Sequence, residues 1–422
     1  MTTPWRVALG AVLGGLLAVA GWRILAHGVA DARVGEDPAG ALHWVSGHPE
    51  ALRTLAEQQF DAGQRQAAAD TAGELLGREP LEGTAWRVLG QVAQAQADPP
   101  RAAQAYAKAI ELTPRDASAR IWLAEQAVAA EDFTGAIDQL DLLLRTHLTA
   151  WGTIFDYMAA QAAHPGFRAA LVARLAAGPE WRRRFLEHLQ HLNPQTGLAP
   201  VADAIHGSLQ VQGALPRRDF ERWIESLLRR GDWPKAYALW SSFLPQGARL
   251  TPVYNGDFIL RPSGTGFDWR TPATPGVTVE FPSGQGARIS FRNRRIDHAG
   301  LEQLLLLPPG RYLLQVEMRP DGLRSDRGLQ WTLACAGSGQ EVASTPPLGA
   351  RGNESTAFEM PVQVPEECGA QWLRLRNAAR VPALQSLSGA VTVTRVAIAP
   401  DRSPPPASGE AEVAGIAPGV VN

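Results

Sequence analysis

A pattern of apolar and small residues that returns about every 34 residues restricts the fold more than any other feature. The best-formed copy runs from Glu82 to Asp116, and its positions are Trp86, Leu89, Gly90, Ala102, Tyr106, Ala109 and Pro114. The same spacing toward the N-terminus gives Leu52, Leu55, Ala56, Ala68, Leu75 and Pro80, and toward the C-terminus it gives Leu123, Ala124, Ala136, Leu140 and Leu143. Three copies in register predict a helical-repeat domain over residues 40–150.

The spacing within one copy has a physical meaning. Gly90 and Ala102 are small, so two antiparallel helices approach closely at these positions, while Tyr106 fills the groove against the next copy. Pro114 ends the second helix because proline cannot continue one. The pattern resembles the tetratricopeptide-repeat family. That resemblance implies a right-handed α-solenoid of three repeats whose concave face holds protein partners, and it implies no chemistry.

Helical spacing continues beyond Ala150 although the repeat fades. AWGTIFDYMAAQAA, FRAALVARLAA and PEWRRRFLEHLQHL each carry apolar residues on one helical face. RDFERWIESLLRRGDWPKAYALWSSFL indicates a helix, a turn at Gly231 and a second helix that crosses at Ala236. We expect residues 151–248 to extend and cap the solenoid; a separate helical domain is the alternative.

From Pro252 the spacing changes to alternation, which is typical of strands. Tyr312, Leu314, Val316 and Met318 alternate with polar residues and predict a half-buried strand. In the last segment, AVTVTRVAIA, the apolar phase shifts by one residue across Arg395, which predicts a β-bulge. The other strand-like segments are VTVEF, ARISFR, GLQWTLAC, TAFEMPVQV and QWLRLRN. Residues 250–400 are therefore predicted to form an antiparallel β-sandwich of the jelly-roll type.

Three motifs in this region resemble a jelly-roll carbohydrate-binding module. They are an opening N-G-x-F strand at Asn255–Phe258, an aromatic loop at Phe267–Trp269 and the turn Pro308–Tyr312. In many such modules an acidic residue after the phenylalanine helps to hold a structural calcium ion. Ile259 stands there in this chain, so no metal site is carried over.

A sugar-binding surface needs an exposed aromatic ring with polar side chains beside it. Trp331 shares its strand face with Leu329 and Leu333 and is assigned to the core. The candidate carbohydrate-binding residues are Trp269, Asp268, Trp372, Arg374 and Arg292. Each has an alternative: Trp269 plugs the end of the sandwich, Trp372 stacks only on Arg374, and Arg292 belongs to a solvated, charged strand end.

The N-terminus carries an uncharged apolar run from Val7 to Trp22, closed by Arg23 and extended through Ala26. Its length approaches the roughly 20 residues that cross a bilayer, and Trp5 and Trp22 would lie at the two interfaces. We favour a retained signal anchor over residues 1–30. The alternative is a signal peptide cleaved at the small residues 28–30. Either places the bulk of the chain outside the cytoplasm, provided that Arg6 and the amino terminus stay inside.

The two cysteines, Cys335 and Cys368, fit such an export. In an oxidising compartment they are expected to form a disulfide that joins two strands of the sandwich. Two buried free thiols are the alternative.

Several function classes lack support in the sequence. With 40 basic and 42 acidic residues the chain carries no basic stripe for nucleic acid. It has no nucleophile elbow, P-loop, dinucleotide fingerprint or CxxC pair. His188 and His191 lack an evident third metal ligand, and Asp297 and Asp326 form a carboxylate pair only if the fold brings them together. We expect no catalysis, no metal and no cofactor.

The order of anchor, repeats and sandwich resembles an envelope protein type of proteobacteria that accompanies exopolysaccharide production. The resemblance implies a single-pass protein of the bacterial inner membrane with its bulk in the periplasm. Its partners would be proteins of a polysaccharide machinery and a polysaccharide. The alternatives are a glycan-modifying enzyme and a scaffold for an unrelated envelope complex. The Pro-rich and Gly-rich segment 401–422 is predicted to be disordered.

Overall fold

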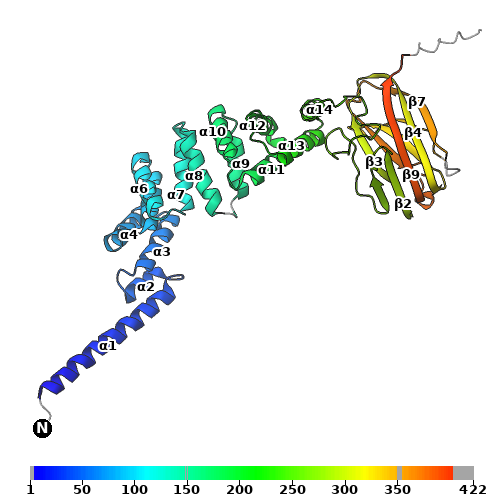
Figure 1. Ribbon diagram of the computed structural model, residues 1–422. Coiled ribbons are helices and arrows are strands. Elements are labelled where there is room, and N and C mark those ends of the chain that lie inside the picture. Colours follow the sequence, from blue (N-terminus) through cyan, green and yellow to red (C-terminus); the bar gives the residue numbers. More distant parts are fainter. Residues whose placement is uncertain (1–3, 148, 150, 349–353, 403–422) are drawn as a thin grey trace, which may run out of the picture. The chain divides into compact units, whose positions relative to one another are not determined.

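A computed structural model describes residues 4–147, 149, 151–348 and 354–402. The chain divides into two compact units, Met1–Asp219 and Phe220–Asn422, and each is described by itself. The first unit is helical, and the second carries two antiparallel sheets (Figure 1). The predicted fold class, an N-terminal apolar helix and helical repeats followed by an antiparallel sandwich, is confirmed. The predicted disorder of segment 401–422 falls, from residue 403 on, outside the described residues.

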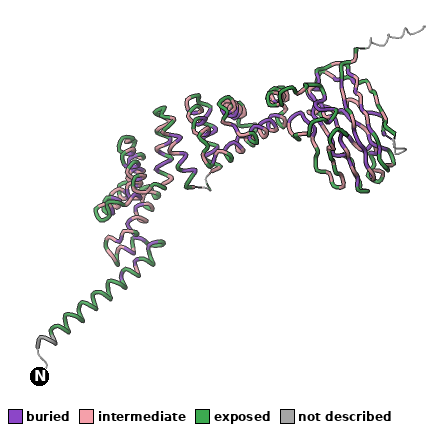
Figure 2. Tube along the Cα trace, in the orientation of Figure 1, coloured by how far each residue is buried: buried purple, intermediate pink, exposed green. Residues whose placement is uncertain are grey.

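Helix α1 (Pro4–Arg33) contains the apolar run. Its segment Ala8–Arg33 is long enough to cross a membrane, and the most apolar 18-residue stretch within it has a mean hydropathy of 1.8 and is exposed (Figure 2). A signal sequence has the same properties. Trp22 lies on α1 and is 61% exposed; the side chain of Trp5 is outside the described part of the structure.

The C-terminal turns of α1 belong to the helical core of the first unit. Ala30 and Val34 form a buried cluster with Ala41 of α2 (Pro38–Trp44) and Ala51 of α3 (Pro49–Asp61). Asp31 also contacts His48, the residue that caps α3, with 2.8 Å between Oδ1 and Nε2. The apolar helix therefore continues into the fold without a break.

The predicted repeats form three helical hairpins. At equivalent positions of the three copies Ala68, Ala102 and Ala136 are fully buried, as small crossing residues should be. A Cβ on Gly90 would lie 2.9 Å from the Tyr106 ring, so glycine is needed there. The hairpins are α3 with α4 (Arg65–Arg78), α5 (Gly83–Ala95) with α6 (Pro99–Leu112), and α7 (Ala117–Ala129) with α8 (Phe133–Thr146).

Further helices follow the repeats. Three of them were predicted: α9 (Trp151–Gln161), α10 (Pro165–Ala176) and α11 (Arg182–Gln190). The fourth, α12 (Ala199–Val211), was not predicted. The predicted hairpin is α13 (Arg217–Arg230) and α14 (Trp233–Ser241), with its turn at Gly231. From Phe220 onward this hairpin belongs to the same compact unit as the sandwich.

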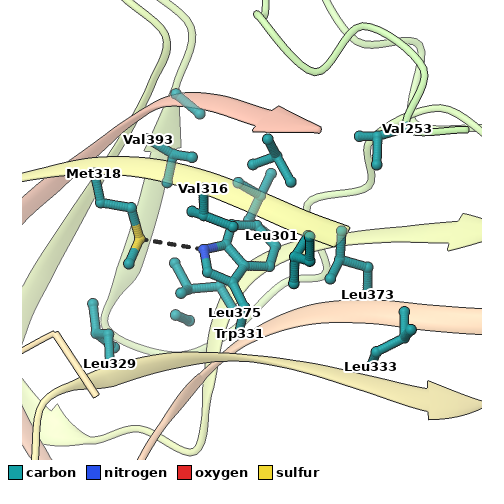
Figure 3. Packing of buried hydrophobic residues seen from close by; sticks show 14 of the residues in the cluster. Val253, Leu301, Val316, Met318, Leu329, Trp331, Leu333, Leu373, Leu375 and Val393 are labelled. Atoms are coloured by element: carbon teal, nitrogen blue, oxygen red, sulfur yellow. Dashed lines mark hydrogen bonds between the residues drawn. The ribbon is translucent and has the colours of Figure 1, made fainter. Parts of the chain in front are cut away.

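The sandwich has a five-stranded sheet in the order β1-β2-β9-β4-β7 and a four-stranded sheet in the order β3-β8-β5-β6. The strands are β1 (Val277–Glu280), β2 (Ala287–Arg295), β3 (His298–Leu305), β4 (Gly310–Ser325), β5 (Leu329–Cys335), β6 (Glu341–Ser344), β7 (Thr356–Val364), β8 (Gln371–Asn377) and β9 (Ser386–Pro400). Trp331 is fully buried between the sheets, with Val316 and Leu375 beside it (Figure 3).

Two details of the sandwich bear on the sequence predictions. The pairing of β4 with β9 passes from Glu317↔Arg395 to Met318↔Val393, so the bulge predicted from the phase change across Arg395 is confirmed. The prediction of an opening strand at the N-G-x-F motif was wrong. Asn255 and Phe258 have φ values of +50° and +55°, which lie outside the strand region, and the segment forms turns. Strands β3 and β6 were not predicted.

Candidate binding sites on the repeats and the sandwich

The first helices of the three hairpins line a hollow of about 540 Å³, which we call the repeat groove. Its walls come from α3, α5 and α7, with Tyr106 of α6 at the base. The lining residues are Phe60, Gln91, Gln94, Ala95, Tyr106, Ser118, Ile121, Trp122 and Glu125. This mixture of apolar and amide groups suits a peptide, whose side chains need apolar contact and whose backbone needs hydrogen bonds.

The base of the repeat groove is held rigid by two buried rings. Tyr106 and Trp122 lie with their centroids 4.8 Å apart, and the Tyr106 hydroxyl donates to Gln94 Oε1 at 2.9 Å. Burial raises the pKa of Tyr106 to about 12, against the opposing charge of Arg87, so the phenol stays a neutral donor. Ile121, beside Trp122, is 45% exposed and offers the apolar contact that is still open.

Arg87 joins the helices that form the groove. From α5 it pairs with Glu57 of α3, and its Nε lies 2.9 Å from Oδ2 of Asp116, the cap of α7. Its Nη1 also donates to Gln91 Oε1 at 3.2 Å. The sequence analysis missed this residue; its signal was an arginine about one repeat after an acidic residue on the same helical face.

Trp269 and Asp268 are placed inside the sandwich. The Trp269 ring is fully buried, packs on Phe258 and Trp331 with centroids 5.0 and 5.8 Å away, and donates from Nε1 to the Asn255 carbonyl at 2.9 Å. Asp268 is 5% exposed. A ring with no open face cannot stack on a sugar, so the plug alternative describes Trp269.

The Asp268 carboxylate closes its own loop. Its Oδ2 accepts from the Ser263 amide at 2.7 Å and from the Ser263 hydroxyl at 2.9 Å. Burial raises the pKa of Asp268, and these hydrogen bonds oppose the rise.

The N-G-x-F motif is also structural. The Asn255 side chain binds Leu260 twice, through Nδ2 to the carbonyl at 2.8 Å and through Oδ1 from the amide at 3.0 Å. A Cβ on Gly256 would lie 2.0 Å from the Val396 carbonyl oxygen of β9, so only glycine fits. The motif that resembles a carbohydrate-binding module therefore fastens the entry of the chain to the sandwich.

Trp372 and Arg374 come together on the outer face of the four-stranded sheet. Trp372 is half-buried, and the Arg374 guanidinium lies 4.8 Å from its ring centroid. The Arg270 guanidinium lies 5.5 Å from the same ring, so Trp372 stacks on more than Arg374 alone. Arg292 is exposed on β2 of the other sheet and does not join them.

Glu302 organises the charges next to Trp372. Its Oε2 accepts from Arg374 Nε at 2.8 Å and lies 3.1 Å from His298 Nε2. Burial alone would raise the pKa of Glu302, but the hydrogen bonds from His298 and Arg374 and their charges outweigh burial and lower it. The carboxylate is therefore held ionised and acts as an anchor for Arg374.

A separate polar hollow of about 310 Å³ lies farther along the same sheet. Its charges are paired, Arg376 with Asp297 and Arg380 with Glu341. The described residues contain no group of three or more His, Cys, Asp or Glu that could hold a metal. His188 Nε2 lies 2.9 Å from Asp156 Oδ1.

The predicted disulfide is present between Cys335 and Cys368. It joins the last residue of β5 to the segment that precedes β8 and spans 33 residues of sequence. Both cysteines are buried, at 4% and 1% exposure.

Comparison with known proteins identifies part of the repeat region. The tetratricopeptide repeat family model matches residues 88–147, and among curated proteins none matches the chain. A thermophilic tetratricopeptide-repeat protein from Thermus thermophilus is 21% identical with a TM-score of 0.27, covering 40% of this chain and 95% of that one. A CBM4 module is 11% identical with a TM-score of 0.27, covering 35% and 99%.

A carbohydrate-binding module from Cellvibrio mixtus lichenase 5A, in complex with cellotriose, is 12% identical with a TM-score of 0.20 and covers 30% of this chain and 89% of that one. At such TM-scores the likenesses to solved structures carry no functional argument. The repeat match does carry one, because tetratricopeptide repeats are protein-interaction units. Residues 88–147 are similar to that family, whose members commonly bind protein partners.

Proposed function

We propose that the chain is a non-catalytic scaffold, anchored in a bacterial inner membrane with its bulk in the periplasm. It binds a protein partner through the repeat groove and a glycan through the sandwich, in support of exopolysaccharide biosynthesis or export. The repeat groove carries the proposal: a rigid aromatic base, an open apolar side chain at Ile121 and amide groups at Gln91 and Gln94 form a surface for a peptide.

Packing of α1 supports a retained anchor. Cleavage after Ala30 would remove Ala26 and Ala30, which are 4% and 0% exposed, and would expose the faces of Ala41 and Ala51 that Ala30 covers. A signal peptide is normally discarded, so burying part of it in the first unit would be without purpose. The intact mass of the protein purified from membranes tests this: we expect residues 1–30 to be present, and a mass that begins near Asp31 would contradict it.

The pairing of surface carboxylates with basic side chains supports a role without catalysis. A glycosidase needs a carboxylic acid with a raised pKa facing a second carboxylate. On the outer sheet face Asp297 is paired with Arg376, and Glu302 is held ionised by His298 and Arg374. Asp268, whose pKa is raised, is buried and bonded to its own loop. Incubation with polysaccharides of several classes should release no reducing ends.

Site-specific photo-crosslinking tests the repeat groove. A photoreactive residue at Ile121 should form a covalent complex with one protein of a polysaccharide machinery in intact cells. The matched position is Val211, which is 90% exposed at the end of α12 in the same unit and should give none. Equal crosslinking at both positions, or none at Ile121, would remove the support for the groove. Loss of secreted polysaccharide in cells that carry Ile121→Glu would connect the groove to the pathway.

A further inference from the structure

The second unit contains a hollow between its helical hairpin and the sandwich, which we call the junction site. It has a volume of about 560 Å³. From the hairpin it is lined by Glu225, Arg229, Arg230 and Trp233, and from the sandwich by Arg270 and Trp372. The sequence analysis assigned these two sides to different domains and so did not bring the residues together.

A bidentate ion pair lies in the lining of the junction site. Arg270 donates to both carboxylate oxygens of Glu225, from Nη1 at 3.0 Å and from Nη2 at 2.8 Å, and the Gly266 amide donates to the same carboxylate at 2.9 Å. Bidentate pairs of this kind fix both side chains in orientation. The Arg270 Nε is buried and has no hydrogen-bond partner among the described residues, so a donor at this site is unused.

Two indole rings border the junction site. A Cβ on Gly337 would lie 3.4 Å from the Trp233 ring, and one on Gly369 would lie 3.1 Å from it, so the ring rests closely on these two glycines. Gly337 and Gly369 lie close to Cys335 and Cys368 in the sequence, so the disulfide joins the two segments on which the Trp233 ring packs. Trp233 and Trp372 are half-buried, so part of each residue remains accessible to solvent.

The lining is positively charged. The lining contains the guanidinium groups of Arg229, Arg230 and Arg270 and the carboxylate of Glu225, which Arg270 engages. Arg230 also has an interaction of its own, so Arg229 is the guanidinium that we assign to the ligand. Arg229 is exposed. Indole rings bind the apolar face of a pyranose, while guanidinium groups bind carboxylates in a bidentate manner. We propose that the junction site binds an acidic saccharide, a chain of uronic acids whose carboxylates pair with arginine and whose ring packs on tryptophan.

This inference rests on the proposed glycan-binding role of the sandwich and specifies its place and ligand class. The polar hollow with Asp297 and Arg376 is a weaker candidate. Its arginines are already paired with Asp297 and Glu341, and the described residues that line it include no aromatic ring. It therefore supplies a matched control, because Arg380 is an exposed arginine there, as Arg229 is at the junction site.

Calorimetric titration of the full chain in nanodiscs of neutral lipid tests the proposal. The probes are oligomers of galacturonic acid and oligomers of galactose of equal length. We expect the acidic oligomer to bind at least about tenfold more tightly than the neutral one, since a charge-assisted hydrogen bond contributes more than a neutral one. Raising the salt concentration should weaken this binding.

Charge reversal locates the ligand. Arg229→Glu should weaken binding of the acidic oligomer by about tenfold or more, whereas Arg380→Glu should leave it within about twofold. Arg229→Lys should recover part of the loss because the charge returns without the planar fork. Equal binding of both oligomers, no binding of the acidic one, or loss with Arg380→Glu and not with Arg229→Glu would each overturn the proposal. Crosslinking at Ile121 is measured on the same variants, so failure of the junction site is distinguished from failure of the repeat groove.

Discussion

Aromatic residues serve opposite purposes in the repeats and in the sandwich. In the repeats Tyr106 and Trp122 form the base of a groove that stays open beside them at Ile121. In the sandwich Trp269 and Trp331 are fully buried and contact each other, with their centroids 5.8 Å apart. Stacked helical hairpins leave a row of side chains on one face, so residues that build the repeat also shape its groove. Two packed sheets instead enclose the aromatic side chains that lie between them.

This contrast separates family motifs that report on binding from those that report on folding. The repeat signature includes Tyr106, which lines the repeat groove. The N-G-x-F and Phe-Asp-Trp motifs of the sandwich hold its entry loop in place, and the surface that remains open involves Trp372 and Arg270 instead. Substitutions in the sandwich motifs should therefore lower stability, while substitutions in the groove should lower binding.

Truncation of the buried ring should have the largest effect. We expect Trp269→Ala to destabilise the sandwich by about 3–5 kcal/mol, because it leaves a cavity and an unpaired Asn255 carbonyl. Hydrogen exchange of the β3 and β5 amides measures it. Trp372→Ala, at a half-buried ring, is the control and should cost less. If Trp269→Ala cost less than Trp372→Ala, the contrast between the two regions would fail.

Removal of the disulfide should act on one unit only. The chain has two cysteines and both are in the sandwich, so Cys335→Ser with Cys368→Ser should cost the second unit about 3–4 kcal/mol through the entropy of a 33-residue loop. The helices of the first unit should keep their exchange rates. A matching loss in the repeats would show that the units do not unfold separately.

Substitution of one glycine in each region compares how much free energy close packing costs to disturb. Gly256→Ala forces a Cβ to within 2.0 Å of a backbone oxygen, whereas Gly90→Ala brings one to 2.9 Å from the Tyr106 ring. Overpacking costs about 1–3 kcal/mol, and we expect Gly256→Ala at the upper end because a strand must move. Thermal unfolding of both variants checks the order. A larger loss of stability with Gly90→Ala would mean that the entry loop accommodates an added Cβ more easily than the contact between the two helices of the repeat.

The charged face of the sheet should give a smaller, pH-dependent effect. The pKa of Glu302 is lowered from 4.5, so its stabilisation is present above that value and is lost as the pH falls through the lowered pKa. Glu302→Gln should cost about 1 kcal/mol at neutral pH, and the difference should shrink below pH 4.5. Unfolding followed across this range checks it; a constant difference would assign the effect to packing.

Much of the fold could be predicted because its signals are periodic. Ala68, Ala102 and Ala136 repeat at one spacing, and the phase shift across Arg395 indicates a bulge directly. Strand β3 was missed because His298–Leu305 mixes polar and buried residues without alternation. The entry loop was assigned to a strand because its sequence of residue types does not reveal the positive φ of Asn255 and Phe258.

The candidate sites could be predicted only in part. Tyr106 was identified because it belongs to the repeat pattern, whereas Arg87 depends on partners in two other helices. The junction site needs Trp233 and Arg270 to meet across a hairpin and a sheet, and no local pattern specifies that docking. Long-range contacts between unlike elements are therefore what the sequence did not disclose.

The affinity of the crosslinked protein partner for groove variants is the decisive measurement for the repeat groove. We expect Ile121→Glu to weaken binding by about tenfold or more with unchanged thermal unfolding, since a charge would face the apolar contact. Val211→Glu, at an exposed position of the same unit, should bind as the wild type does. Unchanged affinity with Ile121→Glu, or an equal loss with Val211→Glu, would contradict binding in the repeat groove.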